Sequence, residues 1–344
     1  MSEEITIKVG MVGPSRVGKT SFIASMHNRI NDDAMKLGFS FSANNSQTRN
    51  TCIDSLEALK KMASKDGTVI DVSMGPDPTV GVKNFNFKLY KPKLDEFPEL
   101  HFKFTDIPGG WYKTGQSEAE NLLKESDILL LAVDSVALME EDGKYNDARG
   151  NDSARIVESI TPALSRRPAG TPPPFVIIVA TKAETYLRNS ALSNAASSKT
   201  ARGRKELGEK ELRAKIKETY EGLGILKQAS IEVKGCAVET VGNIVLNHIR
   251  EDERGNPTFS FRRIPGMNYS PRYCSLPMRI ILKKVLERAH ENIGEPSIID
   301  WLFTKMGYRT DKEKVREELK KLLEKLSNST SHGSSIEELV FDVI

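Results

Sequence analysis

The segment that most constrains the fold is residues 13–20, Gly-Pro-Ser-Arg-Val-Gly-Lys-Thr, which fits the pattern G-x-x-x-x-G-K-[ST]. An apolar run over residues 5–12 precedes it, and Phe22, Ile23 and Met26 follow it at helical spacing. The glycines let successive backbone N–H groups point inward, and the following helix adds the positive end of its dipole. This order of strand, turn and helix predicts a phosphate-binding loop within an α/β sheet.

The positions of this loop have predicted roles. The expected phosphate-binding residues are Gly13, Ser15, Arg16, Val17, Gly18, Lys19, Thr20 and Ser21. Lys19 is expected to reach the β- and γ-phosphates, and Thr20 to offer its hydroxyl to Mg²⁺. Because ATPases, GTPases and kinases share this loop, the class of protein depends on motifs further along the chain.

Hydrophobic periodicity predicts the fold class. Short apolar runs predict strands buried on both faces at residues 128–133, 175–180 and 231–235. Helical patterns lie near residues 51–64, 117–125, 154–164 and 206–221. Alternating runs at 85–89 and 102–104, joined by a turn through 92–98, predict an antiparallel hairpin. We therefore expect an α/β protein: a mostly parallel sheet with one antiparallel hairpin strand, helices on both faces and a helical C-terminal extension.

The pattern changes near residue 240, beyond which the sequence predicts a strand at 258–261 and helices at 276–291 and 315–326. A nucleotide domain is expected over residues 1–240 and a mainly helical extension over 241–344.

Two long spacers, near residues 38–75 and 188–208, are interpreted as insertions in the first domain. The basic residues of the second spacer lack interleaved aromatic residues, which favours a solvated loop over a nucleic-acid contact. The apolar face of the helix at 315–326 has two interpretations, packing on the chain's own core or docking to a partner or a second copy.

Composition excludes several classes of protein. The chain has 344 residues, 50 basic and 47 acidic, so its net charge gives no reason to expect nucleic acid or an anionic membrane as a partner. Its apolar runs are far shorter than the ~20 residues of a membrane helix. Cys52, Cys236 and Cys274 have no disulfide-framework or metal-ligand spacing, and the N-terminus lacks a secretory signal. We expect a cytoplasmic protein without a membrane span.

Four further motifs lie next to predicted strands. They are Asp77-Pro78-Thr79-Val80-Gly81-Val82, Asp106-Ile107-Pro108-Gly109, Thr181-Lys182-Ala183-Glu184 and Gly235-Cys236-Ala237. The first runs into the strand at 85–89, and each of the others comes at the end of a strand. Since the carboxyl ends of parallel strands meet at one edge of the sheet, the motifs are expected to form one site with the phosphate loop.

This ordered set resembles the P-loop GTPases of the Ras-like and translation-factor-related superclass, over residues 5–240. Its spacers are longer than those of small Ras-like proteins, and within the superclass the chain resembles a large prokaryotic type, such as the GTPases of bacterial conflict systems. The resemblance implies a Mg²⁺-dependent molecular switch that binds GTP and GDP, hydrolyses GTP and acts with a protein effector or activator.

The resemblance also implies residue roles. Thr79 would close on Mg²⁺ and the γ-phosphate, Asp106 would bind Mg²⁺ through water, and the Gly109 N–H would contact the γ-phosphate. The implied metal ligands are thus Thr20, Thr79 and Asp106, and the implied catalytic groups are Lys19, Thr79 and Gly109. The base would be bound by Thr181, Lys182, Glu184, Cys236 and Ala237.

Two departures from the family pattern leave alternatives open. Glu184 stands where the family has Asp, which weakens the preference for guanine and favours an ATP-binding P-loop NTPase as one alternative. Gly110 stands where Ras-like proteins carry a water-orienting glutamine, so unaided hydrolysis is expected to be slow. A nucleotide-binding interaction module with little hydrolysis is the second alternative.

Two side chains near these motifs have competing interpretations. Arg16 is either an internal charge-stabilising group or a solvent-facing loop residue, and the second is preferred. Trp111 is either a partner anchor that is exposed in one nucleotide state or a core residue, with the core slightly favoured.

Overall fold

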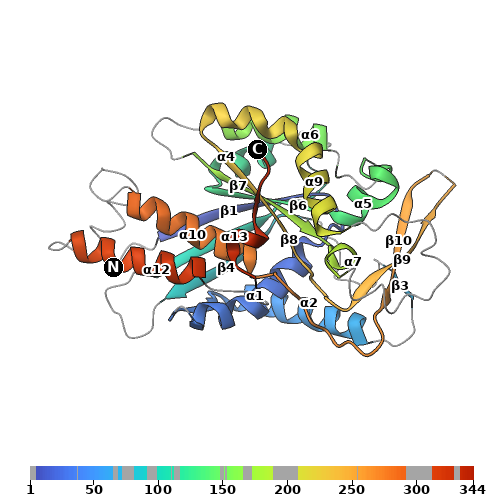
Figure 1. Cartoon of the computed structure of the whole chain (residues 1–344), viewed down its shortest axis with the longest axis horizontal. Coiled ribbons are helices and arrows are strands. Elements are labelled where there is room, and N and C mark those ends of the chain that lie inside the picture. Colours follow the sequence, from blue (N-terminus) through green and yellow to red (C-terminus); the bar gives the residue numbers. More distant parts are fainter. Residues whose placement is uncertain are drawn as a thin grey trace.

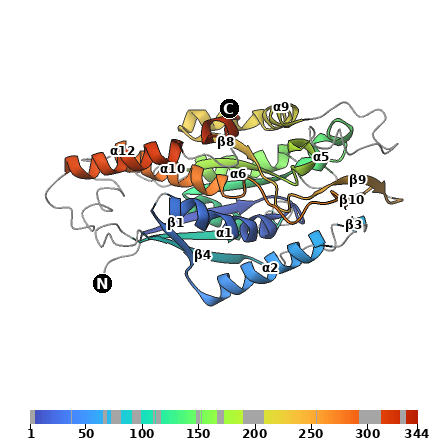
Figure 2. The same cartoon turned by 60° about the horizontal axis from the view of Figure 1, so that its bottom comes forward.

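The structure is a computed structural model. It describes residues 5–36, 38–64, 69–71, 81–90, 99–109, 111, 117–147, 151, 153–165, 173–188, 208–253, 255–291, 312–328 and 334–344. A central sheet runs through the molecule, with helices on both of its faces (Figures 1 and 2).

The main sheet has eight strands in the order β11-β8-β7-β6-β1-β5-β4-β2. Their bounds are β1 Ile5–Val12, β2 Ser40–Ala43, β4 Lys83–Tyr90, β5 Leu100–Asp106, β6 Ile128–Asp134, β7 Phe175–Thr181, β8 Glu232–Ala237 and β11 Phe341–Asp342. The five central strands β5, β1, β6, β7 and β8 are parallel, and β4, β2 and β11 are antiparallel to their neighbours. The expected mostly parallel α/β sheet, with its β4–β5 hairpin, is confirmed.

The central and outer strands differ in how their residues are buried, and residue type explains the difference. Every residue of β6 and β7 is buried, as expected for apolar strands covered on both faces. In β4, by contrast, the buried residues Phe85, Phe87 and Leu89 alternate with more exposed ones. Phe87 stacks on Phe41 of β2, with ring centroids 5.1 Å apart, so the edge strand is held by aromatic packing as well as by its ladder.

The helices pack in two groups. The long ones are α1 Lys19–Lys36, α2 Ser46–Ser64, α4 Ser117–Glu125, α6 Ser153–Ser165, α9 Glu209–Thr219, α10 Leu276–Glu291 and α12 Lys312–Asn328. The short ones are α5 Ser135–Met139, η2 Glu140–Gly143, α7 Glu184–Leu187, η4 Glu221–Ala229 and α13 Ile336–Leu339. One buried cluster joins the sheet to α1, α10, α12 and α13, and the other joins it to α4, α5, α6, α9 and η4.

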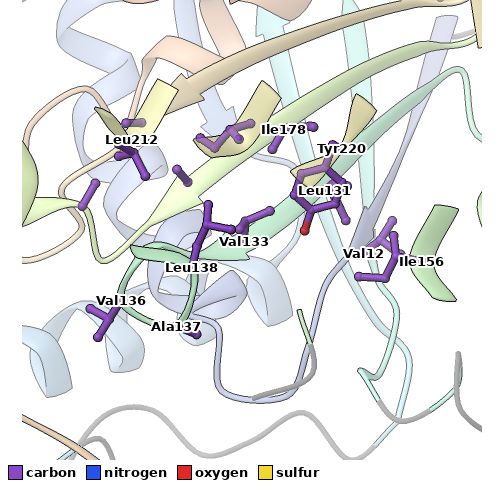
Figure 3. Packing of buried hydrophobic residues seen from close by; sticks show 14 of the residues in the cluster. Val12, Leu131, Val133, Val136, Ala137, Leu138, Ile156, Ile178, Leu212 and Tyr220 are labelled. Atoms are coloured by element: carbon purple, nitrogen blue, oxygen red, sulfur yellow. The ribbon is translucent and has the colours of Figure 1, made fainter. Parts of the chain in front are cut away.

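Figure 3 shows part of the second cluster. Val12, Leu131 and Ile178, from three neighbouring strands, lie among the side chains of Ile156 in α6 and Tyr220 beside η4. Leu131 and Ile178 are completely buried, and each contributes about 2 kcal/mol by leaving water. This core fixes the strands whose carboxyl ends carry the predicted motifs.

A second, smaller sheet has the order β3-β10-β9, all antiparallel. Its strands are β3 Val69–Asp71, β9 Ile244–Glu251 and β10 Pro257–Arg263, and it lies beside α5 and α7 (Figure 1). Tyr145 after η2 meets Phe259 of β10 edge to face, with centroids 6.0 Å apart. The sequence predicted β10 but neither β3 nor β9.

Several regions depart in detail from the sequence expectations. The stretch expected to be an insertion at 38–75 contains β2, which extends the main sheet, as well as α2 and β3. The region after residue 240 contains β10, α10 and α12 as predicted, and also the strands β9 and β11. The turn through 92–98 and almost all of the spacer at 188–208 lie outside the described residues.

In the part of the chain that the structure describes, no helix is both long and apolar enough to cross a membrane. The three cysteines are buried and form no disulfides. In α12, Leu326 is buried in the first core cluster and Leu323 packs against it, so this part of the predicted apolar face contacts the chain's own core.

Candidate functional site

Four of the predicted motifs lie at the carboxyl ends of parallel strands. The phosphate loop follows β1, Asp106 ends β5, Thr181 ends β7 and Ala237 ends β8, while Asp134 at the end of β6 belongs to no predicted motif. Register brings pairs of these positions together, with Met11 beside Asp106 and Asp134 beside Thr181. Parallel pairing thus brings these four motifs to one edge of the sheet, together with Asp134.

The phosphate loop has an unusual backbone. Gly13 has φ 147°, Arg16 has φ 63° and Gly18 has φ 103°. Helix α1 begins at Lys19, and the N–H of Phe22 donates to the Gly18 carbonyl at 2.8 Å. The left-handed region is open to glycine and costly for arginine, so Arg16 stores some backbone strain. Its side chain is exposed, in agreement with the preferred solvent-facing interpretation.

Lys19 is buried at the centre of the loop. Its ammonium donates to the carbonyl of Gly13 at 2.9 Å and of Pro14 at 3.4 Å, and lies 3.6 Å from Asp106 Oδ1. Burial lowers the pKa of Lys19, and the nearby carboxylate of Asp106 opposes this shift. The Lys19 ammonium therefore lies inside the phosphate loop, among two carbonyl oxygens of the loop and the carboxylate of Asp106.

Gly109 lies directly against the phosphate loop. A Cβ at this position would come within 2.3 Å of the Ser15 nitrogen and 2.5 Å of the Pro14 carbonyl carbon. Such distances exclude every side chain, so only glycine lets the two segments approach this closely. The segment that contains Gly109 is also hydrogen-bonded to β1, since the Ile107 N–H donates to the Met11 carbonyl at 3.0 Å.

Two oxygen donors beside the phosphate loop are of the kind that binds Mg²⁺. Thr20 supplies a hydroxyl from the first turn of α1, and Asp106 supplies a carboxylate from the end of β5. Both are hard oxygen donors of the kind Mg²⁺ prefers, and Mg²⁺ usually takes one or two protein ligands together with phosphate oxygens. Among the described residues no group of three or more His, Cys, Asp or Glu forms a protein-only metal cage. The donor set fits a metal shared with phosphates.

Thr181 ties β7 to the phosphate loop. Its hydroxyl lies 2.6 Å from the Val17 carbonyl and 3.0 Å from the Val133 carbonyl, within hydrogen-bond distance of both. Lys182 has φ 55°, and its ammonium lies 2.5 Å from Asp134 Oδ2. Asp134 in turn caps α5 by accepting from the Val136 and Ala137 N–H groups. Sequence patterns did not single out Asp134, because its partner comes from the next strand of the sheet.

Glu184 is almost fully buried, with 3% of its surface exposed. Its Oε1 accepts from the N–H groups of Val241 at 3.0 Å and Gly242 at 3.4 Å, in the loop after β8. Burial raises the pKa of Glu184, and backbone N–H groups, chiefly that of Val241, oppose the shift. One oxygen of this carboxylate, Oε1, is thus occupied by the protein's own backbone.

The motif at the end of β8 is buried as well. Cys236 is completely buried, which raises the pKa of its thiol to about 12, and Ala237 is 9% exposed. The N–H of Val238 donates to the Ala180 carbonyl at 2.9 Å, so β7 and β8 remain paired up to the motif.

Glu239, which belongs to no sequence motif, lies just beyond Ala237. It is fully buried, and its carboxylate pairs with Arg188 Nε at 2.5 Å and Arg272 Nη1 at 3.7 Å. Burial raises its pKa to about 7, and the charge of Glu184 adds to the rise. No motif marks this residue, since its partners come from distant parts of the chain.

Thr79, Gly110 and the basic residues of the spacer at 188–208 lie outside the described residues. Trp111 is described: it is half-buried and packs against the second core cluster, as the slightly favoured interpretation expects.

Comparison with protein families decides the class. A family model described as Double-GTPase 2 matches residues 7–248, which is more than half of the chain and includes the phosphate loop and all the downstream motifs. The chain belongs to the Double-GTPase 2 family. This membership confirms the predicted P-loop GTPase and its function as a GTP-binding switch. The narrower resemblance to bacterial conflict-system GTPases stays a prediction.

The solved structures that resemble this chain are less similar to it than the family model is. One is a signal recognition particle receptor SRb-GTP/SRX complex from Chaetomium thermophilum, at TM-score 0.37 and 14% identity, covering 69% of this chain and 92% of that one. Another is the S. cerevisiae Ski7 GTPase-like domain bound to GDP and inorganic phosphate, at TM-score 0.36 and 12% identity, covering 69% and 44%. Neither is similar enough to support an inference about this Double-GTPase 2 protein. A search of curated proteins gives no significant match.

Proposed function

We propose that this Double-GTPase 2 protein binds Mg²⁺ with GTP or GDP, hydrolyses GTP slowly by itself, and signals its nucleotide state to a protein partner. The observation that carries the proposal is the meeting of Lys19, Asp106 and Gly109 at the phosphate loop. These groups come from two motifs far apart in sequence, and together they supply a cation, a metal ligand and a close backbone N–H. Family membership supports GTP as the nucleotide.

In this proposal the phosphates lie over the loop formed by Gly13, Ser15, Arg16, Val17, Gly18, Lys19, Thr20 and Ser21. Lys19 would exchange the Gly13 and Pro14 carbonyls for phosphate oxygens, which is favourable because a charged acceptor binds an ammonium more strongly than a neutral one. Thr20, Asp106 and Thr79 would hold Mg²⁺. When bound, the metal neutralises charge on the β- and γ-phosphates.

The proposed hydrolysis depends on positioning and on charge stabilisation. The N–H of Gly109 and the ammonium of Lys19 would stabilise charge that develops on the γ-phosphate, and the Thr79 backbone would hold the water. Gly110 has no side chain with which to orient that water, so we expect a slow reaction unless a partner supplies the missing group. Arg16 is exposed and offers a weaker candidate within the chain.

Base binding is proposed for the segment at the end of β7 and for Cys236 and Ala237 at the end of β8. Thr181 would orient the phosphate loop relative to the base through its contact with the Val17 carbonyl. Lys182, held by Asp134, would pack along the nucleoside. Glu184 is treated separately below, because its carboxylate faces backbone N–H groups.

The test begins with the identity of the nucleotide that co-purifies with the protein, followed by competition between GTP and ATP. Single-turnover hydrolysis with and without Mg²⁺, and with and without candidate partners, then measures the chemistry. Lys19→Ala should abolish binding, whereas Lys8→Ala, which removes an exposed lysine of β1 paired with Glu125, should leave it unchanged.

Two outcomes would replace the proposal. Preferential binding of ATP would make the protein an ATP-binding member of the same fold. Tight GTP binding without turnover under any condition would make it an interaction module that uses nucleotide for its shape, an alternative that Gly110 favours.

A further inference from the structure

We propose that Glu184 is a positioning residue that shapes the loop after β8, and that its carboxylate does not contact the base. This inference rests on the proposed function, because it concerns how the same site selects its nucleotide. It assigns to Glu184 a role different from that of the carboxylate at this place in Ras-like proteins, which accepts hydrogen bonds from guanine N1 and N2.

The first argument is the occupancy of the carboxylate. Glu184 Oε1 accepts from two consecutive backbone N–H groups, those of Val241 and Gly242, and the side chain is 3% exposed. Turning it toward a base would leave both N–H groups buried without this acceptor. Buried donors that lose their acceptor carry a desolvation penalty, so the observed pairing opposes such a movement.

The second argument is the conformation of the loop itself. Gly242 has φ 81°, and a Cβ there would come within 1.9 Å of the Ser270 carbonyl oxygen. The N–H of Ser270 donates to the Val241 carbonyl at 3.1 Å, and the hydroxyl of Ser25 donates to the Thr240 carbonyl at 2.8 Å. The loop is therefore held on several sides in one tight turn, and Glu184 accepts the N–H groups at its centre.

The third argument is that the next residue, Thr185, also accepts a hydrogen bond from a backbone N–H group beyond β8. The hydroxyl of Thr185 accepts from the N–H of Leu246 at 2.9 Å, near the start of β9. The first two residues of α7 thus both accept backbone N–H groups from the chain that leaves β8. A pair of neighbouring acceptors aimed at one segment indicates an anchoring role for this end of α7.

One consequence concerns selectivity among purines. Inosine shares O6 and N1–H with guanine but lacks the N2 amino group, and xanthine has a carbonyl at C2. If no carboxylate at position 184 contacts N1 and N2, GTP and ITP should bind with similar affinity. ATP should still be discriminated against, because adenine presents an amino group where guanine presents O6.

The experiment compares Glu184→Gln, Glu184→Leu and a matched control, Glu140→Gln. Glu140 is also a buried glutamate near α7, but it accepts from the hydroxyl of Tyr186 at 2.9 Å. Affinities for GTP, ITP and XTP are measured by calorimetry on the full chain. Amide hydrogen exchange of residues 238–243 is measured on the nucleotide-free protein.

Glutamine keeps an oxygen acceptor, so Glu184→Gln should bind GTP and ITP within about threefold of the parent and gain no affinity for XTP. Loss of a direct hydrogen bond to a charged group would instead cost about tenfold or more. Glu184→Leu removes the acceptor, so exchange at residues 238–243 should accelerate, and GTP and ITP should weaken by the same factor. Glu140→Gln should change neither result.

The proposal is overturned if Glu184→Gln loses GTP affinity tenfold or more while gaining XTP, since its amide would then be pairing with the C2 carbonyl. It is also overturned if exchange at residues 238–243 is unchanged in Glu184→Leu. If the parent binds no guanine nucleotide, the proposed function fails, and the exchange measurement still decides whether Glu184 anchors the loop.

Discussion

The hydroxyl of Thr181 lies 2.6 Å from the carbonyl oxygen of Val17, joining the end of β7 to the phosphate loop across the site. The same hydroxyl is 3.0 Å from the Val133 carbonyl in β6. One buried side chain at the end of β7 therefore contacts both the phosphate loop and the neighbouring strand β6.

Replacing Thr181 with valine keeps the shape and removes the hydroxyl. The single O–H hydrogen that the two buried carbonyl groups share is lost, so we expect the free energy of unfolding to fall by about 2 kcal/mol, with weaker nucleotide binding. Urea unfolding measures the first effect. Ser159→Ala on α6, which removes an exposed hydroxyl, is the control, and equal effects of the two changes would contradict the assigned role.

Gly109→Ala should damage binding through a steric clash. The new Cβ would meet backbone atoms of Ser15 and Pro14, which cannot rotate away, so the phosphate loop must shift. We expect a loss of about 1–3 kcal/mol in stability and nucleotide affinity lower on the order of tenfold. Gly224→Ala serves as the control, because a Cβ there meets nothing within 4 Å. Unchanged nucleotide affinity in Gly109→Ala would show that the two segments separate at no cost.

The buried Glu239 predicts a particular pH dependence of stability. Burial raises its pKa from 4.5 to about 7 in the folded protein. Between these values the folded state binds more protons than the unfolded state, so this contribution to stability is complete below pH 4.5 and is lost as the pH rises to about 7. Relative to the parent, Glu239→Gln should gain stability across this range, by up to about 3 kcal/mol.

Urea unfolding of both proteins at pH 5 and pH 8 checks the expectation for Glu239. Arg188 and Arg272 pair with this carboxylate, and Glu184 lies close enough to affect its pKa. A stability difference that does not vary with pH would mean that these arginines keep Glu239 charged throughout.

Phe341→Ala should loosen the edge of the main sheet. Phe341 is 9% exposed, pairs with Gly235 in the β11–β8 ladder and lies 5.3 Å from the Arg213 guanidinium. We expect a loss of about 3 kcal/mol, typical of truncating a buried phenylalanine. Asp342→Asn, which alters an exposed ion pair with Lys234, should change stability by less than about 0.5 kcal/mol. Similar thermal unfolding of the two variants would show that β11 contributes little.

The sequence predicted the parts of the fold that local signals specify. The apolar runs of β6 and β7 and the turn at residues 13–18 mark strands and a phosphate loop without any distant information. Strand β2, Ser-Phe-Ser-Ala, was missed because it is short and half polar, and it is stabilised by pairing with β4. The two residues of β11 are too few for any periodic signal, and only β8 makes them a strand.

The residues of the candidate site also fall into those that local sequence signals specify and those that depend on distant partners. The motifs located Lys19 and Asp106, whose chemistry is tied to their position in a pattern. Asp134 and Glu239 were invisible, because their importance comes from cationic partners on other strands and loops. The hydrogen bonds that Glu184 Oε1 accepts could not be predicted either, since the donors are backbone N–H groups that any residue except proline could supply.

The pairing of β11 with β8 has a consequence for how the chain is made. The nucleotide-binding edge is complete once β8 has been synthesised, but the outer side of β8 is covered only after α10, α12 and α13 have followed. During that interval β8 presents unpaired backbone groups that a second nascent chain could pair with. Slowing synthesis between β8 and β11 should therefore promote strand exchange between copies, even though β11 pairs with Lys234 and Gly235 of this edge in the finished protein.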